Sequence, residues 1–308
     1  MNIKALVLIC TVFACMLCAC KKNNIDEKLA EEEQKLEEFI KTKYGDAAIC
    51  LGGGAYLVKT HEEIEGATVE AGNYILWNWK QTNQITDEIE YTSDISDVKY
   101  PDSYVHGGPE MTVVLSSKID EGLTQMKKGE KADVYIPSRW LFLDFQPRIF
   151  SVDIVEVIKD LSVYQEALMY GYLRKIHRGV RVDTVKNVVS TIDNTEYNVM
   201  YHIMDKGTGE KITDDMNIET KTTTSYLIRD DEVHPYTVDQ DFTWYTNKIN
   251  TLTKTNCMAE ILKKMNKGGK VVVTMPSKLL WDDNDLPKVQ DQYFVPKWSV
   301  VIFTISIK

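Results

Sequence analysis

One block of sequence occurs twice in this 308-residue chain without a gap, and this repeat most limits how the chain can fold. Residues 126–138 read MKKGEKADVYIPS, and residues 265–277 read MNKGGKVVVTMPS. A short helical pattern precedes both copies, and an alternating hydrophobic strand closes both, at 149–154 and at 302–307. A repeated unit of this kind predicts two domains with the same fold.

Within the first copy, runs rich in β-branched and aromatic residues alternate with turns, which favours an α+β fold with an antiparallel sheet crossed by one short helix. The second copy opens in a similar way, because Ala55–Val58 can be aligned with Met200–Ile203. The period-2 and helical patterns predict strands over 55–60, 74–81, 111–115, 131–137 and 149–158, and a helix over 119–126.

The first twenty residues differ from the rest of the chain. Lys4 is their only charge, and the apolar run that follows is too short for a stable membrane span. The run ends in Leu17-Cys18-Ala19-Cys20, which resembles the lipobox of bacterial lipoproteins, in which Cys20 would carry the lipid. An ordinary secretory signal cut nearby is the alternative. Without residues 1–19 the chain has 35 basic and 46 acidic residues, a net charge of −11.

An acidic chain of this kind is a poor candidate for binding nucleic acid. Only Cys50 and Cys257 lie outside the signal, which argues against a disulfide framework, and the five histidines show no metal-ligand spacing. We therefore expect no metal and no cofactor.

The sequence patterns divide the chain into five parts. The expected parts are a lipoprotein signal (1–20), a charged helical tether (21–45), a first domain (46–160), a linker helix (161–184) and a second domain (185–308).

The order of motifs resembles that of the FKBP-type peptidyl-prolyl isomerases. The segment 201–212 (YHIMDKGTGEKI) resembles the family's opening strand and turn. The segment 121–129 (EGLTQMKKG), which leads to Ile-Pro at 136–137, resembles the family's helix end, M-x-x-G turn, strand and proline. The resemblance covers about residues 50–160 and 190–308. It implies two tandem FKBP-like domains, each a five- to six-stranded curled sheet around one helix, with a shallow apolar pocket between them.

In the first domain, the resemblance implies substrate-binding positions from the second strand to the last. The family's floor Trp falls at Ile119, and its hydroxyl-donating Tyr falls at Phe142, which keeps an apolar wall but has no hydroxyl. The family's Phe-Asp pair falls at Ile89-Glu90. The full set of implied substrate-binding residues is Trp79, Leu115, Ile119, Phe142 and Phe150.

In the second domain, the resemblance places the catalytic positions at Trp281, Phe303 and Met258, and the second-strand Tyr at Thr222. Trp281 could donate only through its indole N–H. Eight positions separate Phe142 from Phe150, against twenty-two between Trp281 and Phe303, so the second domain keeps the longer pocket-capping loop. We therefore expect the working pocket in the second domain.

Rotation about an X–Pro bond faces a barrier of about 18–20 kcal/mol and strictly needs no nucleophile or metal. Together with the lipobox, the FKBP resemblance implies a lipid-anchored cell-envelope protein, on the periplasmic or surface face. It would act on proline-containing segments of exported polypeptides as a peptidyl-prolyl isomerase or a chaperone-like protein. A non-catalytic binding or scaffolding lipoprotein with decayed clefts is the alternative. A surface protein that binds carbohydrate or another ligand is a third reading.

Overall fold

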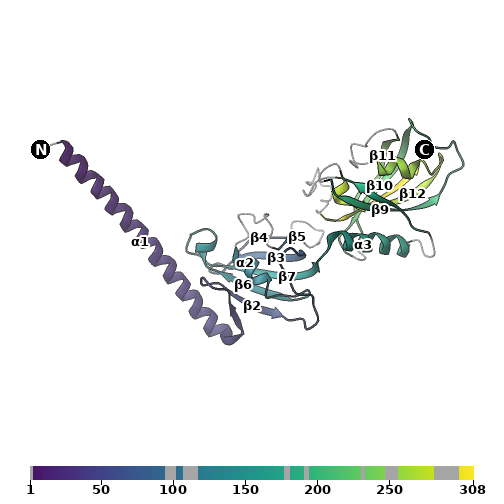
Figure 1. The fold of residues 1–308 in the computed structure, drawn as a ribbon. Coiled ribbons are helices and arrows are strands. Elements are labelled where there is room, and N and C mark those ends of the chain that lie inside the picture. Colours follow the sequence, from purple (N-terminus) through teal and green to yellow (C-terminus); the bar gives the residue numbers. More distant parts are fainter. Residues whose placement is uncertain are drawn as a thin grey trace. The chain divides into compact units, whose positions relative to one another are not determined.

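The computed structural model describes residues 3–93, 102–106, 117–176, 181–190, 194–229, 233–246, 256–280 and 298–308, and the expected strand at 111–115 lies outside them. Contacts divide the chain into two compact units, Met1–Lys159 and Asp160–Lys308 (Figure 1). Among the helices described, none is long and apolar enough to cross a membrane.

The first unit contains one antiparallel sheet and a short helix against it. Its strands are ordered β1-β2-β6-β7-β3-β4, with β5 pairing to β3. In chain order the elements are α1 (Ile3–Tyr44), η1 (Gly45–Ala47), β1 (Ala48–Cys50), β2 (Tyr56–His61), β3 (Tyr74–Asn83), β4 (Ile89–Thr92), β5 (Asp102–Val105), α2 (Ser117–Leu123), β6 (Lys131–Ile136), η2 (Ser138–Trp140) and β7 (Arg148–Ile158).

The second unit repeats this arrangement. Its strands are ordered β8-β9-β12-β13-β10-β11, which is the order of the first unit with each strand replaced by its equivalent. This identity of order confirms the tandem repeat and the α+β class. The elements are α3 (Leu161–Ile176), β8 (Asp183–Val189), β9 (Glu196–Asp205), β10 (Asn217–Leu227), β11 (Val233–Tyr245), α4 (Cys257–Leu262), β12 (Lys270–Pro276), η3 (Ser277–Leu279) and β13 (Val300–Ile307).

The strand register repeats as well. Val134 in β6 pairs with Phe150 in β7, and Val273 in β12 pairs with Phe303 in β13. This register confirms the expected match between the two closing strands. The glycine of the repeated M-x-x-G turn has a positive φ in both units, +85° and +81°, a conformation that glycine adopts without steric cost.

The opening strands correspond with a shift of one residue from the sequence alignment, which matched Tyr56 with Tyr201. Leu57 and Tyr201 occupy the equivalent positions, because they pair with equivalent residues of β6 and β12. Side chains alternate between the faces of a sheet, so a shift of one residue exchanges the faces. The corrected register brings Ala55 and Val199, both fully buried, into correspondence.

The core of the first unit lies on the sheet face that contacts α2, here called the inner face. It includes Leu57, Val134 and Phe150 from the sheet and Ile119 and Leu123 from the helix. In β7 burial alternates over most of the strand, with the even-numbered residues from 148 to 154 facing inward. The alternating sequence of this strand therefore builds the inner face, as expected.

Helix α1 packs on the opposite, outer face of the same sheet. Leu29, Leu36 and Ile40 are buried on one side of the helix, and the last two contact Val58 and Tyr135. The segment expected to be a tether that packs at most loosely on the domain is thus part of the first unit. Three apolar residues on one helical face suffice, because the sheet supplies aromatic partners.

Helix α3 covers the outer face of the second sheet in the same way. Its buried Leu168, Met169 and Leu173 pack against Met200 of β9 and Ile302 of β13. The segment 161–184, expected as a linker helix, therefore contains a helix of the second unit followed by the beginning of β8 at Asp183.

Candidate functional site

Three of the predicted pocket residues of the first unit lie together on the inner face. Trp79 stacks on Phe150 with ring centroids 5.0 Å apart and an interplanar angle of 14°. Trp77 lies beside both rings, with centroids 6.3 and 6.4 Å away. Ile119 of α2 is buried in the same apolar cluster. Trp79 is partly exposed, whereas Phe150 and Ile119 are buried, so the indole of Trp79 is the accessible part of this aromatic cluster.

Of the two other predicted positions of this unit, the structure describes only Phe142, which does not join the aromatic cluster. Phe142 is 39% exposed, and its ring lies 5.2 Å from the guanidinium carbon of Arg148. Its neighbour Leu141 packs on the cluster instead. Leu115 lies outside the described residues.

In the second unit Met258 and Phe303 are both fully buried. The ring of Phe303 contacts Trp244 of β11 edge-on, with centroids 5.8 Å apart. Trp281 lies outside the described residues. A ligand could reach Met258 or Phe303 only after local opening, whereas Phe242, whose ring centroid lies 4.6 Å from that of Trp244, is partly exposed.

Trp79 and Thr222 occupy equivalent places in the two sheets. Trp79 pairs with Val152, and Thr222 pairs with Ile305, each two residues after the inward phenylalanine of the last strand. The hydroxyl of Thr222 lies 3.0 Å from that of Thr220. A threonine at this position provides no aromatic surface, so the two inner faces differ at the place of Trp79.

A polar network centred on Arg148 adjoins the aromatic cluster of the first unit. The buried guanidinium donates to both carboxylate oxygens of Glu90, at 2.9 Å each. It also donates to both carboxylate oxygens of Asp144, at 2.7 Å each, and to the Gln146 carbonyl oxygen. The side-chain amide of Gln81 donates to Glu90 at 2.7 Å. All five N–H donors of Arg148 are therefore used within this network.

The network keeps its two carboxylates ionised. Burial alone would raise the pKa of Glu90, but hydrogen bonds from Arg148 and Gln81 outweigh it and hold the pKa below its ordinary value. Burial opposes ionisation of Asp144 too, and the bonds from Arg148 again lower its pKa. Of the predicted Ile89-Glu90 pair, only Glu90 joins the network, because Ile89 is mostly exposed.

Sequence reasoning missed the role of Arg148. Its side chain points to the same, inner face of β7 as those of Phe150 and Val152, so an arginine occupies a core-facing position of an alternating strand. A buried charge at such a position requires partners, and this signal predicts a carboxylate nearby. The partner Asp144 is in the loop just before the strand, and no periodicity marks it.

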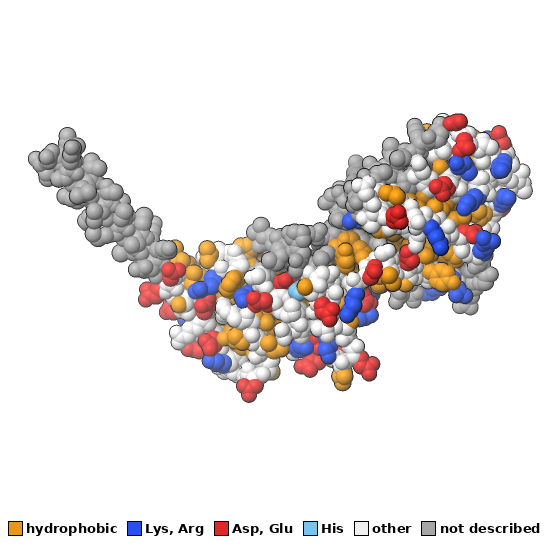
Figure 2. Space-filling view, viewed as in Figure 1, with side chains coloured by type: hydrophobic (Ala, Val, Ile, Leu, Met, Phe, Trp, Pro, Cys, Tyr) orange, Lys and Arg blue, Asp and Glu red, His pale blue; other side chains and the backbone are white. Residues whose placement is uncertain are grey.

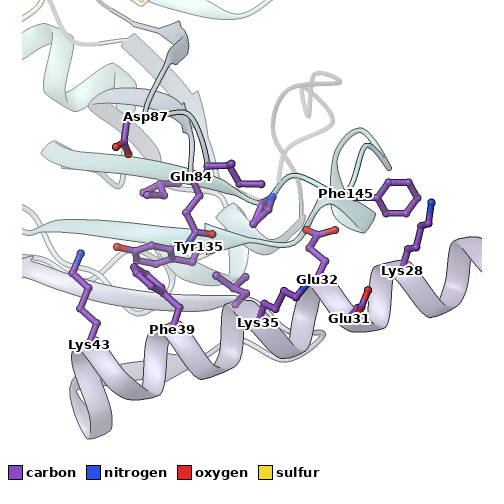
Figure 3. Close-up of a pocket in the computed structure, with 14 residues that line it drawn as sticks. Lys28, Glu31, Glu32, Lys35, Phe39, Lys43, Gln84, Asp87, Tyr135 and Phe145 are labelled. Atoms are coloured by element: carbon purple, nitrogen blue, oxygen red, sulfur yellow. The ribbon is translucent and has the colours of Figure 1, made fainter.

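The loop between β6 and β7 is held by α1. Ser138 donates its backbone N–H to Glu32 at 2.7 Å and its hydroxyl to the other carboxylate oxygen at 2.5 Å. Arg139 forms an ion pair with Glu33, and Phe145 donates its backbone N–H to the Ser138 hydroxyl at 3.1 Å. Figure 3 shows Glu32 of α1 directed toward this loop. The outer helix thus fixes the loop that leads to the Arg148 network.

A groove runs between α1 and the outer face, on the side of the sheet opposite the aromatic cluster (Figure 3). Its volume is about 780 Å³. Its charges balance, since three lysines and three carboxylates line it, so no ligand charge is favoured. The lining residues are Lys28, Glu31, Glu32, Lys35, Leu36, Phe39, Lys43, Gln84, Ile85, Asp87, Tyr135, Phe145, Pro147 and Ile149.

Metal-binding and surface features offer no further site within the described ranges. There, no three His, Cys, Asp or Glu side chains are grouped closely enough to hold a metal ion. Cys50 is exposed, Cys257 is buried, and neither forms a disulfide. Acidic and basic side chains are interspersed on the face shown in Figure 2.

No protein-family model matches the sequence, and no curated protein sequence does. Among solved structures, a peptidyl-prolyl cis-trans isomerase from Pseudomonas syringae pv. tomato is similar at 16% identity and a TM-score of 0.34, covering 43% of this chain and 95% of its own. FkpA from Escherichia coli is similar at 17% identity and 0.36, covering 51% and 74%. The three FKBP domains of wheat FKBP73 are similar at 12% and 0.29, covering 84% and 97%.

The strand order and register shared by the units carry the assignment of a tandem fold.

Proposed function

We propose that this chain binds proline-containing segments of exported polypeptides and isomerises their X–Pro bonds. The carrying observation is the partly exposed Trp79, stacked on Phe150 above the short helix α2 in the first unit. An apolar aromatic surface removes water from a bound amide and disfavours its charge-separated planar form, which lowers the barrier to rotation. In the second unit the proposed catalytic residues are Trp281, Phe303 and Met258.

The experiment is a refolding assay limited by proline isomerisation, with residues 21–308 added as catalyst. The uncatalysed step takes about 10–100 s at 25 °C, so acceleration is easily followed. Trp79→Ala should abolish the contribution of the first unit, and Trp281→Ala that of the second. Tyr170→Ala, which removes an exposed ring from α3, is the matched control. No acceleration by folded protein would remove the enzyme proposal.

A non-catalytic binding role is the second candidate, and the side chain of Phe142 favours it. This ring has no hydroxyl to donate and lies on Arg148. Proline-dependent binding without acceleration of refolding would establish that role.

We also propose that a lipid on Cys20 anchors the chain in the cell envelope, with the two units on the periplasmic or surface face. The supporting feature is the sequence Leu17-Cys18-Ala19-Cys20, followed by Lys21 and Lys22. The wild-type chain should partition with the membrane fraction, and mass spectrometry should find the lipid on Cys20. A Cys20→Ser variant that remains equally membrane-bound would contradict the anchor.

A further inference from the structure

The network around Arg148 carries one excess negative charge. One guanidinium is shared between the two carboxylates of Glu90 and Asp144, which leaves a net charge of −1. The side chain of Glu90 is 23% exposed and that of Asp144 is 35% exposed. Because all five donors of Arg148 are already used, the arginine cannot offer a bond to an anionic ligand. The network is therefore suited to a cation.

An unpartnered acceptor lies in the same network. Gln81 is fully buried, and its amide nitrogen donates to Glu90. A carboxylate can only accept, so the nitrogen must face Glu90 and the amide oxygen faces elsewhere. That oxygen, Oε1, has no hydrogen-bond donor in the structure described. A buried acceptor without a donor is costly, so a ligand whose N–H reaches this enclosed oxygen after local opening of the network gains free energy of binding.

The network and the aromatic cluster share one face of the sheet and are direct neighbours. Gln81 follows Trp79 by two positions in β3, and Arg148 precedes Phe150 by two positions in β7. Gln81 and Phe150 are opposite each other in the strand pair. Residues two apart in a strand lie about 6.6–6.8 Å apart on the same face. A peptide whose proline lies on Trp79 therefore has its neighbouring side chain within reach of the network.

We propose that the first unit selects proline-containing segments that carry a lysine or arginine directly beside the proline. This inference rests on the proposed function, and it adds a charge preference to the same site. The ammonium or guanidinium group pairs with Glu90 and Asp144 at their exposed edges, and it donates an N–H to the enclosed Gln81 oxygen when the network opens locally. Phe142, lying on the Arg148 guanidinium, closes the other side of the network.

The test measures peptide affinity with the full chain by fluorescence anisotropy. Six labelled peptides carry Lys, Leu or Glu immediately before or immediately after one proline. In at least one series the Lys peptide should bind about tenfold more tightly than the Glu peptide at low salt. The partly screened excess charge of the network attracts the lysine and repels the glutamate. The ratio should fall as salt is raised.

Two variants separate this network from the general acidity of the chain. Asp144→Asn removes its excess charge and keeps a side chain that can accept from Arg148, so the Lys-to-Glu ratio should drop to about twofold or less. Asp153→Asn removes one charge from the opposite face of β7, where Asp153 pairs with Lys131, and should leave the ratio unchanged.

The outcomes are distinct. Equal affinity for the Lys, Leu and Glu peptides would overturn the charge preference and leave the proposed function intact. An equal loss of preference in Asp144→Asn and Asp153→Asn would overturn it too, because long-range charge would then be the cause. No binding of any peptide by folded protein would overturn both proposals.

Discussion

Replacing Glu32 by alanine should detach helix α1 from the loop between β6 and β7. The Glu32 carboxylate is buried and accepts two hydrogen bonds from Ser138, at 2.7 and 2.5 Å. A hydrogen bond to a charged group contributes about 1.5–3 kcal/mol, so the two together contribute about 3–6 kcal/mol. Removing the carboxylate also relieves part of its desolvation cost. We therefore expect a net loss of about 2–4 kcal/mol.

Hydrogen exchange followed by mass spectrometry measures this loss where it arises. The amide of Ser138 donates to Glu32, and the amide of Phe145 donates to the Ser138 hydroxyl. A loss of 2–4 kcal/mol corresponds to roughly 30- to 700-fold faster exchange, since each 1.4 kcal/mol is a factor of ten. Peptides covering 138–147 should show this acceleration, while peptides of the second unit should not change.

Two further variants make the reasoning refutable. Glu32→Gln keeps one acceptor oxygen for Ser138 and should lose only about 1 kcal/mol. Glu31→Ala removes an exposed carboxylate from the same helical turn and should change stability by no more than about 0.5 kcal/mol. If Glu32→Ala exchanges no faster over 138–147 than Glu31→Ala, the carboxylate does not hold the loop.

Three other substitutions test the remaining parts of the fold. Gly53→Ala would place a Cβ 2.6 Å from the Trp140 ring at a φ of +58°, whereas Gly45→Ala has a similar φ of +54° and open space around its Cβ. Both variants carry the conformational cost of a positive φ, but only Gly53→Ala should lose a further ~1–3 kcal/mol of unfolding free energy, measured by thermal unfolding. Arg148→Met should destabilise the protein more at pH 6 than at pH 3, because its two carboxylate partners have lowered pKa values. Their contribution to stability is present above pH ~4 and is lost as the pH falls through the folded pKa values. Equal losses of stability at both pH values would contradict this. Gln165→Leu should cost about 1–3 kcal/mol, because the Trp298 carbonyl oxygen then loses its 2.8 Å bond inside the protein, and amide exchange in the second unit should accelerate.

The repeat made much of the fold predictable from the sequence. A gapless block with the same glycine turn and the same inward phenylalanine after it fixes strand register without knowledge of the loops. The match between Phe150 and Phe303 was therefore correct. The match of Tyr56 with Tyr201 was wrong, because period-2 patterns tolerate a one-residue slip and two identical residues favoured it.

The polar part of the candidate site was much less predictable. The family resemblance placed Trp79, Phe150 and Ile119 in one pocket, and the structure brings these three side chains together. The Arg148 network joins β3, β4, β7 and a loop, and its members are far apart in sequence. Polar contacts between distant segments leave no periodic pattern in the sequence. The bond from Ser138 to Glu32 of α1 is another such contact, which is why α1 was interpreted as a tether.

The two outer helices belong to the repeat, although their sequences gave no hint of it. In each of these helices a buried polar residue is followed by a buried apolar residue four positions later and by another eight positions later. This spacing puts all three side chains on the helical face that packs on the sheet. Glu32 accepts from Ser138, and Gln165 donates to Ser299, whose carbonyl oxygen accepts from Ser277, the equivalent of Ser138. Helix α1 thus binds the start of the loop after the penultimate strand, and α3 binds the end of the equivalent loop, which is itself bonded to its start. A repeat of helix and sheet accounts for this, whereas a tether and a linker would meet equivalent loops only by coincidence. The equivalent residues are Glu32, Leu36 and Ile40 in α1 and Gln165, Met169 and Leu173 in α3.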